Sequence, residues 1–148
     1  MRARALIVVL AIALSACAVA AQHDPAARSP DALQLAGTQW RFVRVAGHAV
    51  ASGVNATLDF ERNGHVSGHA GCNGFGGPWD ASNGALHFGD LISTQMACLQ
   101  PSGAMQTEQG VFAALRNTAD ARIERRRLIL LDARGTALAA LSQQGDAQ

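Results

Sequence analysis

Apolar and polar residues alternate along most of the chain after residue 37. In 37–45 the apolar side chains of Trp40, Phe42 and Val45 are separated by arginines, and in 57–60 Leu58 and Phe60 share one face. Successive side chains of a strand point to opposite faces, so this alternation predicts half-buried strands. We expect strands over 37–45, 57–60, 65–69, 78–81, 85–88, 91–96, 121–124, 128–132 and 137–141.

Turn signals separate several of these strands. Asn63-Gly64 and Asn83-Gly84 are each flanked by alternating segments, a combination typical of β-hairpins. An Ala-Arg-Gly turn over 133–135 joins the last two predicted strands. The strands therefore follow one another as antiparallel neighbours.

One segment has helical periodicity. Met105, Glu108, Phe112 and Leu115 recur at three- and four-residue spacing, and we expect Ser102 to cap the helix. A charged Glu108 within an apolar stripe needs a partner such as an arginine or a helix-terminal amide, because an unpaired buried charge costs several kcal/mol. Many strands around one helix predict an α+β domain of about 110 residues with a single core.

Glycines are concentrated between Gly68 and Gly77, next to Cys72. This density favours an ordered but irregular loop with close backbone approaches. We expect Asn73 to adopt left-handed geometry or to bond nearby backbone, while Phe75 and Trp79 fasten the loop onto the core.

Three ordered motifs resemble the META/HslJ domain family of heat-shock-associated bacterial envelope proteins, over 35–141. They are Gly71-Cys72-Asn73-x-Phe75-x-Gly77, Thr94-x-Met96-Ala97-Cys98 and Met105-x-x-Glu108-x-x-x-Phe112-x-x-Leu115. The resemblance implies a curled antiparallel sheet or incomplete β-barrel with one packed helix. It also implies an association with heat-shock response and antibiotic tolerance, without an established reaction. The chain departs from the family pattern at Gly74, Trp79 and Gln95, where Arg, Tyr and a basic residue are common.

The N-terminus has the layout of an export signal. Arg2 and Arg4 precede an apolar run over 5–14, which is too short to span a bilayer. Leu14-Ser15-Ala16-Cys17 resembles a lipobox, so we expect cleavage of 1–16 and lipidation of Cys17. The alternative is cleavage after Ala20, which releases a soluble periplasmic protein. We interpret 17–34 as a flexible tether and 35–143 as the domain of an outer-membrane lipoprotein that faces the periplasm.

The net charge of the exported chain is close to zero. Without 1–16, ten arginines face eleven acidic residues, a net charge of −1. This balance does not favour nucleic acid or electrostatic binding to lipid headgroups. We interpret the run Arg125-Arg126-Arg127 as a device that keeps a sheet edge soluble.

Two cysteines remain once Cys17 is assigned to lipid. In an oxidising compartment the one possible intramolecular pair is Cys72–Cys98, and we expect this disulfide. Closing a loop across 26 positions stabilises by roughly 3 to 4 kcal/mol in the chain-entropy model. The rival hypothesis is a reactive thiol, although the Cys-x-x-Cys spacing of redox pairs is missing.

Three histidines raise a metal-site alternative. His65 and His69 share a predicted strand face, but lie roughly 13 Å apart along it, and His87 lies on another strand. Zinc ligands must converge within about 2 Å of the ion, so we predict no metal and no cofactor. No hydrolase elbow or phosphate loop is complete, and we assign no catalytic residue.

We therefore predict a monomeric, non-enzymatic, lipid-anchored envelope protein that binds an apolar ligand or peptide segment or acts like a chaperone. A curled sheet with a helix leaves room for an apolar groove. The alternative is a protein-docking module that uses the 68–79 loop. A thiol or metal enzyme is the third hypothesis.

Overall fold

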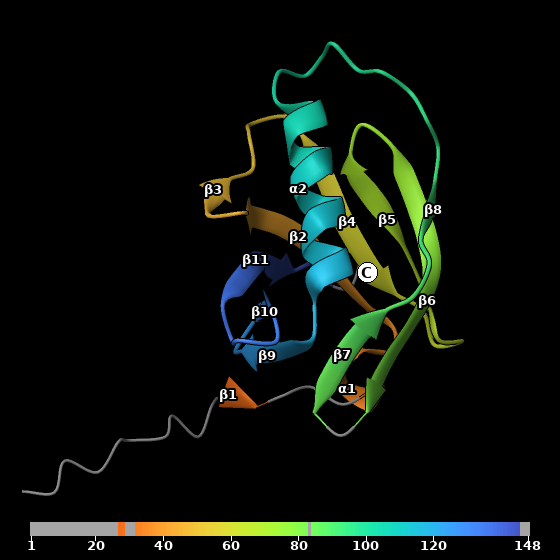
Figure 1. Ribbon diagram of the computed structural model, residues 1–148, viewed down its shortest axis with the longest axis vertical. Coiled ribbons are helices and arrows are strands. Elements are labelled where there is room, and N and C mark those ends of the chain that lie inside the picture. Colours follow the sequence, from red (N-terminus) through yellow and green to blue (C-terminus); the bar gives the residue numbers. More distant parts are fainter. Residues whose placement is uncertain (1–26, 29–31, 83, 146–148) are drawn as a thin grey trace, which may run out of the picture.

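The protein is one antiparallel sheet curled around a single long helix, in a computed structural model that describes residues 27–28, 32–82 and 84–145 (Figure 1). The strands are β1 (Ala27–Arg28), β2 (Thr38–Val45), β3 (His48–Ala49), β4 (Asn55–Phe60), β5 (His65–Gly71), β6 (Gly74–Ser82), β7 (Ala85–Phe88), β8 (Ile92–Ser93), β9 (Asp120–Glu124), β10 (Arg127–Leu131) and β11 (Ala137–Gln143). The helices are α1 (Ala32–Leu35) and α2 (Ala104–Asn117). Within the described ranges, neither helix is long and apolar enough to cross a membrane.

Strand order explains the curl. The neighbours run β1-β9-β10-β11-β2-β4-β5-β6-β7, with β3 beside β2 and β8 beside β6. One further pair, Ala85 with Asp120, brings β7 back to β9, so the sheet almost closes on itself without forming a regular barrel. The predicted α+β class with a curled antiparallel sheet is confirmed.

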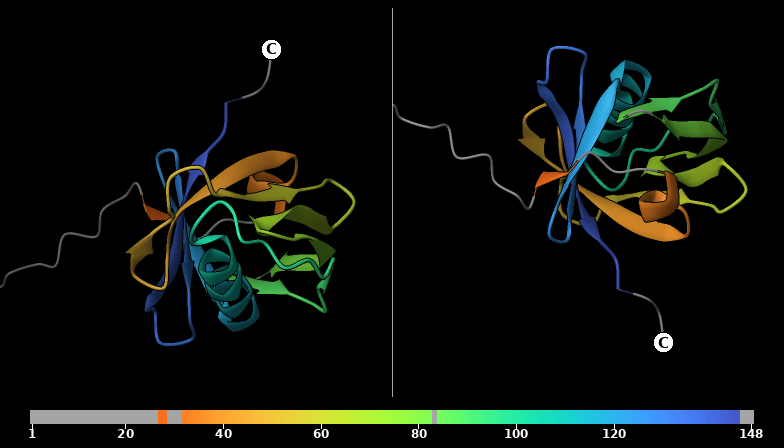
Figure 2. Two further views of the ribbon diagram at one scale, coloured as in Figure 1. Left: turned by 90° about the horizontal axis from the view of Figure 1, so that it is seen from above. Right: turned by 90° about the horizontal axis from the view of Figure 1, so that it is seen from below.

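The inner face of the curl holds the core. Alternate residues of the strands point inward, and the largest wholly buried side chains are Trp40, Phe42 and Phe60. Figure 2 shows α2 between the blue strands β9–β11 and the green strands β5–β7, where it contacts both groups. The helix therefore occupies the interior of the curl.

The buried face of α2 differs from the predicted stripe. Met105, Glu108 and Phe112 are only half-buried, whereas the helix buries Ala104, Thr107, Val111, Ala114 and Leu115. A Cβ atom on Gly110 would lie 2.8 Å from Val45 Cγ1, so the helix approaches β2 very closely. This close contact favours small side chains on the buried face. The helix is therefore rotated about its axis relative to the orientation that the predicted apolar stripe implies.

The predicted cap of α2 is wrong. Gly103, with a left-handed φ of 88°, occupies the N-cap position, and no side chain caps the helix. The Ala104 N–H instead donates to the Pro101 carbonyl at 3.1 Å, so a backbone turn replaces the Ser102 hydroxyl.

The glycine-rich stretch is regular, contrary to our expectation. It forms the end of β5 and the start of β6, and these strands pair from His65 with Pro78 to His69 with Gly74. A Cβ atom on Gly68 would lie 2.2 Å from the Thr57 carbonyl oxygen, so this glycine is required by close approach between strands. The predicted close approaches are present, but within a ladder rather than a loop.

The remaining differences concern the ends of elements. The strand expected over 91–96 is reduced to β8. The ordered part includes β1, which pairs with β9, and α1, whose Leu35 is wholly buried. Both begin within the segment interpreted as a tether. The signal segment, Cys17 and Asn83 lie outside the described residues.

Candidate functional site

The turn between β5 and β6 is fixed by its position against α2. Gly71 has a φ of 115°, and a Cβ atom there would lie 2.6 Å from the Ala104 carbonyl oxygen. Only glycine fits this combination of positive φ and close contact. The next two residues, Cys72 and Asn73, are therefore held directly beside the start of the helix.

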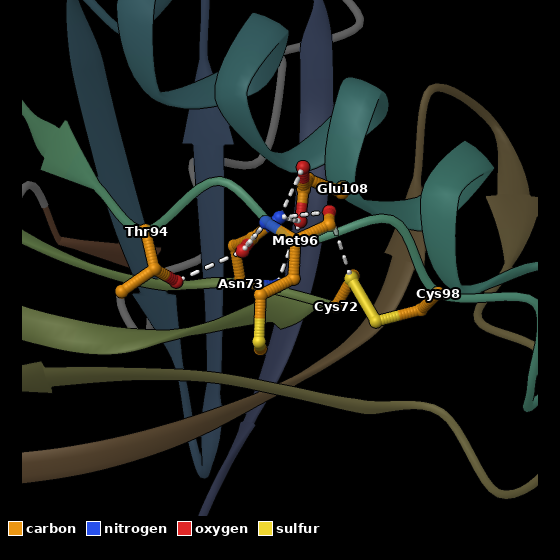
Figure 3. Close-up of a disulfide and its surroundings, with 6 residues drawn as sticks. All are labelled: Cys72, Asn73, Thr94, Met96, Cys98 and Glu108. Atoms are coloured by element: carbon orange, nitrogen blue, oxygen red, sulfur yellow. Dashed lines mark hydrogen bonds between the residues drawn. A yellow bond between two sulfur atoms is a disulfide. The ribbon is translucent and has the colours of Figure 1, made fainter.

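Asn73 is the polar centre of this region, and its side chain and backbone are 98% enclosed, with 2% exposed. Its backbone N–H donates to Glu108 Oε2 at 2.7 Å, and its Nδ2 donates to both oxygens of the same carboxylate at 3.0 and 3.1 Å. Figure 3 shows the carboxylate of α2 directed at this amide. Glu108 thus has a partner, as predicted, but the partner is Asn73 rather than an arginine or a helix-terminal amide.

The other side of the Asn73 amide holds the chain that follows β8. Asn73 Oδ1 accepts hydrogen bonds from the Thr94 hydroxyl at 2.8 Å and from the Met96 N–H at 2.7 Å. Asn73 Nδ2 also donates to the Met96 carbonyl oxygen at 3.0 Å. A single buried side chain therefore joins three segments: the β5–β6 turn, the segment after β8 and α2 (Figure 3). We call Asn73, Thr94, Met96 and Glu108 the Asn73 network.

A disulfide reinforces the same junction. Cys72 and Cys98 are bonded, with Cα atoms 5.7 Å apart, as the sequence predicts. Cys72 Sγ also lies 3.3 Å from the Met96 carbonyl oxygen, a contact without a proton because this sulfur is bonded to its partner. Cys72 packs with Val54 and Ala104 in a small second core. Neither of these two cysteines offers a thiol for chemistry while the disulfide is intact.

The segment secured in this way exposes large apolar side chains. We call residues 91–100 the apolar loop. Ile92, Met96 and Leu99 are 79%, 57% and 90% exposed, and they are the exposed large hydrophobic residues of the described ranges. An open hollow of about 380 Å³ lies beside Ile92 and is lined by Gly74, Phe75, Gly76, Ile92, Ser93 and Thr94.

The aromatic residues proposed for docking are in the core. Phe75 is 6% exposed and meets Phe112 edge to face, while Trp79 is 8% exposed and meets Phe60 in the same manner. Their predicted role in fastening this stretch to the core is confirmed. Docking through these two side chains is not possible on this surface.

The histidines do not converge. His65 and His69 lie on the outer face of β5, as their spacing predicts, and His87 lies opposite Asp80 on the β6–β7 ladder. No group of three or more His, Cys, Asp or Glu side chains could hold a metal ion within the part of the chain that is described. Of the residues in the three motifs, the fold brings together Gly71, Cys72, Asn73, Thr94, Met96, Cys98 and Glu108. Gly77 and Phe112 lie outside this cluster, Gly77 against Leu91 and Phe112 against Phe75.

Comparison with known proteins identifies the family. The META domain model matches residues 33–145, which is more than half of the chain. The chain belongs to the META domain family. No curated protein matches the sequence significantly.

Solved structures share the fold of this chain. A protein from Burkholderia xenovorans, solved by NMR, is 25% identical with a TM-score of 0.63, covering 91% of this chain and 99% of that one. A second NMR structure is 23% identical with a TM-score of 0.62, covering 76% and 94% of the two chains. A DUF4847 family protein from Bacteroides vulgatus ATCC 8482 is 12% identical with a TM-score of 0.57, covering 76% and 98%, and shows the fold alone.

Sequence reasoning missed the exposure of Ile92 and Leu99. A signal was present, because the segment from Leu91 to Leu99 contains large apolar residues without strict alternation or helical spacing. The central role of the Asn73 side chain was missed too, since its partners come from segments far apart in sequence.

Proposed function

We propose that this META domain protein is a non-enzymatic, lipid-anchored envelope protein that binds an extended apolar segment of a partner protein along the apolar loop. The observation that carries the proposal is the exposure of Ile92, Met96 and Leu99 on a segment fixed by a disulfide and the Asn73 network. Full burial of a large apolar side chain is favourable by roughly 1.5–3 kcal/mol, so a partner that covers these side chains would form a stabilised complex.

The fixed backbone supports binding rather than disorder. A loop that is already ordered does not lose conformational freedom when a partner binds, and this raises affinity. Met96 adds a flexible thioether that adapts to differently shaped partners.

The edge of β8 supports an extended partner. β8 pairs with β6 through Phe75–Ser93 and Gly76–Ile92, and no strand in the described ranges pairs with its other edge. An extended peptide can add to such an edge through backbone hydrogen bonds, while side-chain hollows provide selectivity. The hollow beside Ile92 would receive one apolar side chain of the peptide.

Several features support a non-enzymatic role. Glu108 is held by Asn73, and Cys72 and Cys98 are joined, so the acid and the thiols nearest the loop are committed to structure. Because Phe75 and Trp79 are buried, the alternative of a protein-docking module requires that the apolar loop, and not these two side chains, contacts the partner.

Binding can be tested with the mature chain and a panel of fluorescent Val- and Leu-rich peptides. A variant combining Ile92→Ser, Met96→Gln and Leu99→Ser should lose peptide binding while its melting temperature stays unchanged. Met96→Leu is the matched control and should bind like the parent protein. Equal binding by the triple variant and the parent would contradict the proposal.

The anchor requires its own test. Intact mass of the protein extracted from its native membrane should show an acylated Cys17 and two thiols that appear only after reduction. A mass equal to that of an unacylated chain beginning at Ala21 would instead support the soluble periplasmic alternative.

A further inference from the structure

The outer side of β2, β9, β10 and β11 carries arginines that lie far apart in the sequence. Ladder pairing places Arg122, Ile129, Ala140 and Arg44 in one row across four strands. The adjacent row contains Glu124, Arg127, Ser142 and Arg41. Directly paired residues share a face, so these four arginines lie on one surface, which we call the arginine face.

This surface is the outer one. Trp40, Phe42, Leu128, Leu130 and Leu141 of the same strands are buried against the core, and alternation turns the arginines away from it. Arg41, Arg44 and Arg127 are exposed, and the side chain of Arg122 is 43% exposed. Neighbouring strands lie about 4.8 Å apart, so the first row spreads its two guanidinium groups over a broad area.

Two acids lie on this face among the four arginines. Glu124 is ion-paired with Arg122 at 2.7 Å and is paired with Arg127 across the β9–β10 ladder, and Asp120 lies two residues before Arg122 on the same side of β9. Arg125 and Arg126 add two exposed positive charges at the β9–β10 turn, so the arginines still outnumber the acids. The Asp132 carboxylate at the β10–β11 turn interacts with Arg134, which offsets it. Overall charge near zero therefore conceals a basic surface.

A hollow separates the two arginines of the first row. It has a volume of about 180 Å³ and is lined by residues that include Arg44, Arg122, Ile129 and Ala140. Arg44 donates one hydrogen bond to the Gly47 carbonyl and has further N–H groups. Guanidinium groups bind phosphate well, and the apolar side chains at the base of the hollow can contact the carbon atoms next to that phosphate.

The chain enters the domain beside this face. β1 pairs with β9 through Ala27–Glu124 and Arg28–Ile123, and Figure 1 places β1 next to β9, across the molecule from β8. Residues 18–26 extend at most about 30 Å. An acyl chain on Cys17 would therefore hold the β9 edge within that distance of the membrane surface.

We propose that the arginine face rests on the anionic headgroups of the membrane that holds the Cys17 anchor. The inference builds on the lipid anchoring in the proposed function and assigns the orientation of the domain. The lipid anchor would hold the chain at the membrane, and the basic surface would set which side of the domain faces it. The apolar loop, on the other side of the molecule, is left accessible to its partner.

The test is sedimentation with vesicles of the mature chain carrying Cys17→Ser, so that no acyl chain contributes. Vesicles are made of phosphatidylcholine, alone or mixed with phosphatidylglycerol. The protein should bind the mixed vesicles and be released as ionic strength approaches ~0.15 M. Equal binding to both vesicles, or binding to neither at low ionic strength, would overturn the inference.

Two matched variants locate the contact. Arg41→Gln and Arg44→Gln together should weaken binding roughly five-fold for each arginine, about twenty-five-fold in total. Arg122 is retained because its removal would leave Glu124 without its ion pair. Arg62→Gln and Arg116→Gln remove the same charge from exposed positions outside this face and should have little effect. Equal losses in both variants would mean a non-specific effect of net charge and would overturn the assignment.

Failure of this inference and failure of the proposed function are distinguishable. The arginine variant should bind the apolar peptides like the parent, and the Ile92, Met96 and Leu99 variant should bind anionic vesicles like the parent. Lost vesicle binding in the second variant would place the membrane contact on the apolar loop instead.

Discussion

The apolar loop and the β9–β10–β11 segment are both surface regions, but they are ordered by different interactions. The apolar loop contains one two-residue strand and is held by Asn73 and a disulfide. The β9–β10–β11 segment has five-residue ladders, with one register shift after Leu130, and the wholly buried Leu128, Leu130 and Leu141. Order is concentrated in a few side chains in the first region and spread over many contacts in the second.

This difference has a consequence for mutation. Loss of one side chain in a ladder leaves the backbone bonds in place, whereas loss of the Asn73 side chain removes bonds to two other segments at once, the chain after β8 and α2. The largest effects of polar substitutions should therefore be found in the Asn73 network, and small effects on the β9–β10–β11 surface.

The largest effect is expected for Asn73→Ala. The substitution removes the Nδ2 hydrogen bonds to the Glu108 carboxylate and leaves the Met96 N–H without Asn73 Oδ1, while the backbone N–H of residue 73 can still donate to Glu108. We expect a loss of about 2 to 4 kcal/mol in the free energy of unfolding, measured by urea denaturation. Asn55→Ala, at an exposed position of β4, is the control and should cost little. A loss below about 1 kcal/mol would mean that the network is not the centre of order.

Removal of the disulfide comes next. Cys72→Ser with Cys98→Ser should cost roughly 3 kcal/mol, because the unfolded chain is no longer cross-linked. Amide exchange should accelerate at Met96 but not at Leu130, which lies in a ladder. Uniform acceleration at both amides would contradict the separation of the two regions.

A smaller effect is expected for Thr94→Val. The variant loses one hydrogen bond to Asn73 Oδ1, and the exposed position allows water to replace it in part. The expected cost is about 0.5–1 kcal/mol by thermal or urea unfolding. A double-mutant cycle with Asn73→Ala should show coupling between the two residues, and strict additivity would argue against it.

The smallest effect belongs to the ladder region. Hydrogen bonds from the backbone N–H of Thr136, and secondarily of Arg134, lower the pKa of Asp132 below its usual value. A lowered folded-state pKa stabilises above the unfolded pKa of about 3.9, and this contribution disappears as pH falls through the folded value. Asp132→Ala should thus be slightly less stable at neutral pH, and the difference should shrink in acid. A difference that grows in acid would show that the sign is wrong.

The sequence predicted the parts of the fold that depend on local pattern. Alternation located β2, β4 and β9–β11, and the Cys72–Cys98 pairing followed from the count of exported cysteines. Asn-Gly at 63–64 likewise marked the hairpin between β4 and β5.

Long-range packing set the limit of prediction. The rotation of α2 depends on how closely Gly110 approaches Val45, which no helical periodicity encodes. The partners of Asn73 and the rows of the arginine face depend on strand order and register, so residues distant in sequence become neighbours only in the folded sheet. Glu108 was noticed as anomalous, but its partner could not be identified from spacing.

Binding of an extended apolar segment to the apolar loop can be located by NMR. The best-binding Val- or Leu-rich peptide is titrated into the isotopically labelled mature chain while amide shifts are followed. The account predicts that the shifts concentrate at Ile92, Ser93, Met96 and Leu99, with β9–β11 unaffected. Shifts concentrated on β9–β11, or saturable binding without shifts in the apolar loop, would contradict it.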